Sequence, residues 1–191
     1  MENQKFEKLI SLSTKIDAFI NKIGRFHIWL VGIMTIISAY NAITRYLGKY
    51  LGLDLSSNAF IETQWYLFSL IFLLGGSYAF LHNAHVKIDI LYNRFSDEVK
   101  TKINLFGTLF FLMPFSLLMI VVSIPSVVNS WKVLEMSPDP GGLPRFPLKT
   151  FVPISFVLLL LQGISYFIKN YIHLKTHKEF PEDRPITEKS I

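Results

Sequence analysis

The side chains that could do chemistry are few, and they lie at the edges of long apolar segments. Cysteine is absent, which excludes disulfides, thiolate metal sites and thiol redox chemistry. Of the carboxylates, only Glu62 stands close to an apolar run, at its edge, whereas a proton-coupled carrier needs an ionisable group within the membrane. The histidines stand at or beyond the ends of the runs, where they cannot hold a haem between helices. They are also too scattered to form the histidine clusters of an iron-dependent desaturase: His27, His82, His85, His173 and His177. We therefore expect no catalytic residue, no metal site and no cofactor.

The elements that must position these groups are transmembrane helices. The chain of 191 residues is 51% apolar and only 17% charged, against about 25% charged in an ordinary soluble domain. Four uncharged runs each approach the roughly 20 residues that a helix needs to cross a bilayer. We predict an all-α integral membrane protein with an amphipathic interfacial helix over 1–25, a four-helix membrane domain over 26–168 and a polar tail over 169–191. The expected spans are about 26–46, 62–82, 103–125 and 149–169.

Lysine and arginine are distributed unevenly around the spans, which predicts the orientation. If both termini and the loop between the second and third spans are cytoplasmic, fourteen basic residues lie inside and five outside. We therefore expect a multi-pass membrane protein with both termini in the cytoplasm. The net charge of +5 is explained by this pattern, so we expect membrane lipids and no nucleic acid as partners.

Two further segments show apolar residues at helical spacing. In residues 1–25, lysines flank an apolar face that can lie in the membrane interface, although a soluble helix would show the same pattern. Residues 85–102 form a second such segment, and Ser96 with the acidic residues after it predicts the start of the third helix. Pro114 predicts a kink within that helix, and Pro125 its end.

Two stretches of sequence are specific enough to indicate a family. The first contains Glu62, Trp65, Tyr66, Gly75, Gly76, His85, Lys87 and Asp89. The second is the run Ser-Pro-Asp-Pro-Gly-Gly-Leu-Pro over residues 137–144. With the four-helix layout, over roughly residues 25–170, they resemble the small membrane (Q, DctQ-like) subunit of tripartite ATP-independent periplasmic (TRAP) transporters.

The resemblance implies a place in the bacterial inner (plasma) membrane and separate roles for three proteins. A periplasmic binding protein captures an organic acid, a large membrane subunit moves it in symport with sodium, and the small subunit scaffolds the large one. Two other classes of function stay open on the sequence alone: a self-contained four-helix channel or small carrier, and a membrane enzyme. The enzyme is disfavoured by the residues that are missing.

Each residue of the two stretches has a structural and a functional interpretation. Glu62 is either a solvated carboxylate at a helix start or a subunit contact, and Trp65 and Tyr66 are either interfacial anchors or contacts. Gly75 and Gly76 permit close helix approach, while His85, Lys87 and Asp89 form a solvated face or a structural contact. The remaining candidates belong to a rigid loop that either docks the binding protein or braces the fourth helix: Pro138, Asp139, Gly141, Gly142, Pro144 and Arg145.

Overall fold

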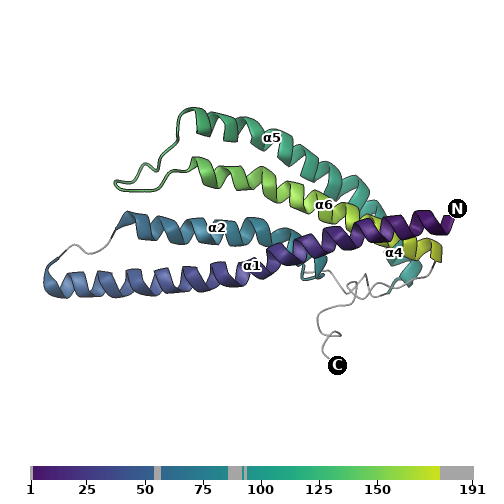
Figure 1. Cartoon of the computed structure of the whole chain (residues 1–191), viewed down its shortest axis with the longest axis horizontal. Coiled ribbons are helices and arrows are strands. Elements are labelled where there is room, and N and C mark those ends of the chain that lie inside the picture. The colour runs from purple at the N-terminus through teal and green to yellow at the C-terminus, as the bar shows by residue number, and fades with distance from the viewer. Residues whose placement is uncertain (1, 54–56, 86–91, 93, 177–191) are drawn as a thin grey trace, which may run out of the picture.

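A computed structural model describes residues 2–53, 57–85, 92 and 94–176, and the described chain is built from helices (Figure 1). The predicted all-α fold with four helices long and apolar enough to span a membrane is confirmed. The helices are α1 (Glu2–Leu51), α2 (Asn58–Leu81), α4 (Asp97–Gly107), the π-helical segment η1 (Thr108–Leu112), α5 (Met113–Lys132) and α6 (Phe146–Thr176).

Helix α1 is one uninterrupted helix, so the predicted interfacial segment and the first span are not separate elements. Its 50 residues extend over about 75 Å at 1.5 Å per residue, more than twice the roughly 30 Å of a bilayer core. The N-terminal part packs against α6, and Ser13, Asp17 and Ile20 are buried there. The outer face of this part is exposed, and its place at the membrane surface stays a prediction.

Helix α6 is the centre of the bundle. It contacts α1, α2, α4, η1 and α5, and in Figure 1 it lies between α2 and α5. Its buried positions are therefore the most numerous, and several of them are small or polar: Ser155, Gln162, Gly163 and Ser165. Small residues allow close packing in lipid, where association gains little from the hydrophobic effect.

Helices α1 and α2 approach closely because a glycine on each faces a ring on the other. A Cβ atom added to Gly24 would overlap the ring of Tyr78, and one added to Gly75 would lie 3.4 Å from Nε2 of His27. The same His27 nitrogen is 3.0 Å from the carbonyl oxygen of Ile71. A Cβ on Gly76 would meet nothing within 4 Å, so only one glycine of the predicted pair makes this approach.

The third span is a continuous run of α4, η1 and α5. Ser96 is the N-cap of α4, with Asp97 and Glu98 in its first turn, as predicted. Pro114, where a kink is expected, comes just after a π-helical turn, because proline offers no N–H and crowds the preceding carbonyls. The prediction that Pro125 ends the helix is wrong, since α5 continues to Lys132.

We expect Gly24→Leu to separate α1 from α2, because its side chain must displace the Tyr78 ring. Such overpacking costs about 1–3 kcal/mol, measured as a lower midpoint of thermal unfolding of the purified protein. Gly32→Leu is the matched control, since a Cβ there meets nothing within 4 Å. Equal midpoints for the two variants would contradict the contact between Gly24 and Tyr78.

Candidate functional site

Residues of the two characteristic stretches that lie more than seventy positions apart in the sequence meet at one end of the bundle. Glu62 on α2 is only 6% exposed, and its carboxylate accepts a hydrogen bond from the backbone N–H of Leu143 at 2.5 Å. The same carboxylate accepts a hydrogen bond from the hydroxyl of Ser137. One turn further along α2, the Tyr66 hydroxyl donates to the carbonyl oxygen of Pro144. Glu62 and Tyr66 therefore hold the loop between α5 and α6, and we call this set of contacts the loop clamp.

The loop itself is folded tightly enough to meet these two side chains. The backbone N–H of Ser137 donates to the Leu143 carbonyl at 3.1 Å, and that of Arg145 donates to the Glu135 carbonyl at 2.8 Å. Gly141 has a φ of +73°, a conformation that other residues adopt reluctantly. At Gly142 the constraint is space, because an added Cβ would lie 2.8 Å from both Glu62 carboxylate oxygens.

An ion pair joins the beginning of the loop to α6. Glu135, just beyond α5, accepts a hydrogen bond from Lys149 on α6 at 2.5 Å and another from the hydroxyl of Ser130 at 2.7 Å. The Lys149 ammonium group, followed by the Ser130 hydroxyl, holds the pKa of the Glu135 carboxyl below its ordinary value. The carboxylate thus stays charged, and the contact stays formed, at lower pH than an isolated glutamate would allow.

The other predicted residues of the loop divide into an exposed tip and a clamped base. Pro138, Asp139 and Gly141 are exposed, whereas Gly142, Pro144 and Arg145 are half-buried at the base. The side-chain amide of Asn58, at the start of α2, donates to the Pro140 carbonyl at 3.0 Å. The tip is thus an exposed surface carried on a fixed base.

The remaining predicted residues do not join this cluster. Trp65 is 67% exposed on the outer side of α2, which is compatible with an anchor in lipid headgroups or a contact with another protein. His85 lies beyond the opposite end of α2, with its ring centroid 6.0 Å from that of Phe80. Lys87 and Asp89 lie outside the described residues.

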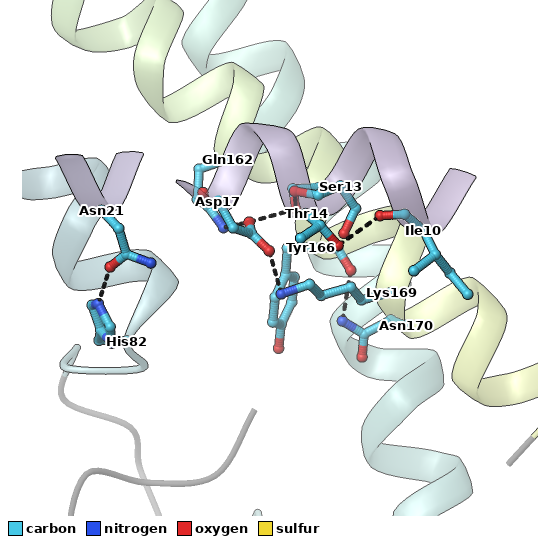
Figure 2. Close-up of polar contacts among 11 residues, drawn as sticks. Ile10, Ser13, Thr14, Asp17, Asn21, His82, Gln162, Tyr166, Lys169 and Asn170 are labelled. Atoms are coloured by element: carbon cyan, nitrogen blue, oxygen red, sulfur yellow. Dashed lines mark hydrogen bonds and ion pairs between the residues drawn. The ribbon is translucent and has the colours of Figure 1, made fainter. Parts of the chain in front are cut away.

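A buried polar network at the opposite end of the bundle was not predicted (Figure 2). Asp17 on α1 forms an ion pair with Lys169 on α6, with 2.5 Å between Oδ2 and Nζ, and both side chains are at most 5% exposed. The other carboxylate oxygen of Asp17 accepts hydrogen bonds from the Ser165 hydroxyl at 2.6 Å and from the Gln162 amide at 3.1 Å. Also on α1, Asn21 has its Oδ1 atom 2.7 Å from Nε2 of His82, the residue that follows α2.

This network corrects the expectation that Glu62 is the only carboxylate close to a span. Gln162 and Ser165, two polar residues of the fourth expected span, hydrogen-bond to another helix through Asp17. A signal is present in the sequence, because Ser13, Asp17, Ile20 and Gly24 recur at helical spacing on one face of α1. The lysines around Asp17 instead favour an interfacial helix with a solvated polar face, so the burial of Asp17 is not evident from the sequence.

The loop clamp and the buried polar network both join parts of the chain to one another. Among the described residues, no three histidine or acidic side chains are grouped so that they could hold a metal ion. Asp17 and Lys169 neutralise each other, and Glu62 is occupied by the loop. The arrangement can therefore fix helices and a loop in place.

Residues 34–171 match the family model for the DctQ component of tripartite ATP-independent periplasmic transporters. The chain belongs to the DctQ family. It is thus a small membrane subunit of a TRAP transporter, as the two stretches predicted. Searches of curated proteins and of solved structures found no match.

The DctQ match covers the whole loop clamp but, of the buried network, leaves out the residues on α1. It begins within α1, after Asp17, and ends after Lys169 on α6. Glu62 and the whole loop from α5 to α6 lie inside it. The partner of Lys169 is therefore supplied by a part of the DctQ-family chain that lies before the matched region.

We expect Glu62→Leu to release the loop from α2, because the Leu143 N–H and the Ser137 hydroxyl both lose their acceptor. The thermal unfolding midpoint should fall, and limited proteolysis should cut within residues 133–145. Glu7→Leu, at an exposed position of α1, should change neither property. A loop that resists protease equally in wild type and Glu62→Leu would contradict the clamp.

For the buried network, we expect Asp17→Leu or Lys169→Met alone to lower the free energy of unfolding by about 3–5 kcal/mol, because each leaves one buried charge without its partner. The double variant should be more stable than the sum of the two losses predicts, since no charge is left unpaired. Thermal unfolding of all three variants gives this coupling, with the exposed Lys175→Met as control. Strict additivity would show that the pair does not form.

Proposed function

We propose that this DctQ-family subunit is the fixed scaffold for a large TRAP membrane subunit. The large subunit would carry out sodium-coupled uptake of an organic acid delivered by a periplasmic binding protein. The observation that carries this proposal is that the buried carboxylates Glu62 and Asp17 are both engaged within the chain. Glu62 holds a loop and Asp17 holds a neighbouring helix, so neither carboxylate is placed as a moving carrier of protons or ions.

The exposed surface of the spanning helices supports a partner in the membrane. Large apolar side chains project from α1, α2 and the third span, including Trp29 at 72%, Phe72 at 73% and Phe111 at 67% exposure. We propose that one of these helix faces packs on the large subunit and that lipid covers the others. Gly76, open on α2, allows another helix to approach closely.

We further propose that the exposed loop tip docks the periplasmic binding protein. The orientation expected from the basic residues, with both termini cytoplasmic, would place this loop in the periplasm. The clamp supports the proposal because a preformed surface loses little conformational entropy on binding. Asp139 supplies a charge at the exposed tip, while Arg145 belongs to the clamped base.

Reconstitution into liposomes tests the scaffold role. The chain alone should transport no organic acid under a sodium gradient, whereas the chain with its large subunit and binding protein should. Removal of residues 177–191 should leave co-purification with the large subunit intact, because α6 and its buried Ile172 are retained. Transport or conduction by the chain alone would instead establish the self-contained channel or carrier.

The same proteoliposomes test docking with Asp139→Ser. Assembly should be normal, and transport should fall at low binding-protein concentration and recover as that concentration rises. Glu7→Ser, an exposed carboxylate at the other end of the bundle, is the matched control. Docking at the tip is wrong if transport by Asp139→Ser equals wild type at every concentration.

A further inference from the structure

A groove of about 570 Å³ opens between α2, the α4–η1–α5 run and α6, at the end of the bundle opposite the loop clamp. Its polar lining is concentrated at one end, where Asn83, His85 and Asn104 lie. Its other end is apolar and is formed by Phe111, Leu112 and Phe115. A groove that changes from polar to apolar along its length suits an amphiphile rather than a wholly apolar segment.

The length and position of the groove match one leaflet of a bilayer. From Asn104 to Phe115 the helix rises by about 16 Å at 1.5 Å per residue, and half of a roughly 30 Å hydrocarbon core is about 15 Å. The charged residues of α4 all precede Ile103 and lie at the polar end: Asp97, Glu98, Lys100 and Lys102. The polar end therefore coincides with the membrane surface, and the apolar end reaches about the bilayer centre.

The ammonium group of Lys100 is connected to the polar end of the groove through two contacts. The Tyr92 hydroxyl donates to Oδ1 of Asn104 at 3.1 Å, and Nζ of Lys100 lies 5.7 Å from the centroid of the Tyr92 ring. Lys100 also pairs with Asp97, at 3.5 Å. An amphiphile with a negatively charged head would place that charge near Lys100, where attraction to anionic lipid is worth about 1 kcal/mol per basic residue.

The depth of the groove depends on a glycine at the start of the π-helical turn. Gly107 lines the groove, and a Cβ added there would meet nothing within 4 Å. On α6, Gly163 allows the side chain of Leu112 to pack closely, since a Cβ added to this glycine would lie 2.9 Å from Cδ2 of Leu112. The α4–η1–α5 run therefore packs closely against α6 at Leu112 and leaves space for the groove at Gly107.

We propose that this groove binds one phospholipid of the adjacent leaflet, with an acyl chain along Gly107, Phe111 and Phe115 and the phosphate near Lys100. The bound lipid fills the space between α2 and the third span. This site is separate from the docking and scaffold roles proposed above, and its occupancy can be measured without a transport assay.

The test measures phospholipid retained by the detergent-purified transporter complex, by native mass spectrometry and by extraction. Wild type should retain one phospholipid that survives extended washing. Gly107→Leu should lose it, because the leucine side chain occupies the groove, whereas Gly32→Leu on exposed α1 should retain it. Retention by Gly107→Leu equal to wild type would overturn the site.

Lys100→Gln tests the contact with the head group. Delipidated complex is titrated with phosphatidylglycerol and with phosphatidylcholine, and the rise in the thermal unfolding midpoint is measured for each. Wild type should gain more from phosphatidylglycerol, and Lys100→Gln should lose that preference. Equal preference in both proteins would overturn the phosphate contact.

A cross-linking experiment tests whether a protein segment fills the groove instead. If Phe111→Cys cross-links to the large subunit in the washed complex, a protein segment fills the groove and the lipid proposal is wrong.

Discussion

Helices within a bilayer gain little from the hydrophobic effect when they associate, because lipid tails are as apolar as leucine. Polar contacts and small residues must therefore specify which helices pack together. In this chain, Glu62 joins α2 to the loop before α6 at one end, and Asp17 joins α1 to α6 at the other. Between these ends, Gly24 and Gly75 set the spacing of α1 and α2. The central position of α6 follows, because α6 takes part in the contacts at both ends.

The parts of the fold that a single sequence can predict are those encoded locally. Uncharged runs indicate the four spans, the acidic turn after Ser96 indicates the start of α4, and the proline- and glycine-rich run indicates a rigid loop. The residues of the loop clamp stand out as candidates, but their mutual contact does not follow from the sequence. Pattern and propensity do not say that Glu62 and Leu143 are neighbours, because that depends on how α2 packs beside α6.

The missed features share this dependence on packing. Asp17 lies among lysines in the sequence, and its partner Lys169 is on the last helix of the bundle. Proline is also a poor guide to helix ends here, since Pro125 and Pro153 both lie inside helices rather than ending or opening them. In a membrane, a helix continues past proline when neighbouring helices and local π-turns satisfy the freed carbonyl groups.

The Asp17–Lys169 pair also bears on how the protein is made. Asp17 leaves the ribosome early, whereas Lys169 is translated only after the first three spans and most of the fourth. Until then the carboxylate must stay in water or at the lipid surface, because burying it unpaired is costly. The N-terminal part of α1 therefore cannot complete its contacts with α6 until Lys169 has been translated, although it is synthesised first. The buried pair thus forms only in a chain that contains its last helix, α6.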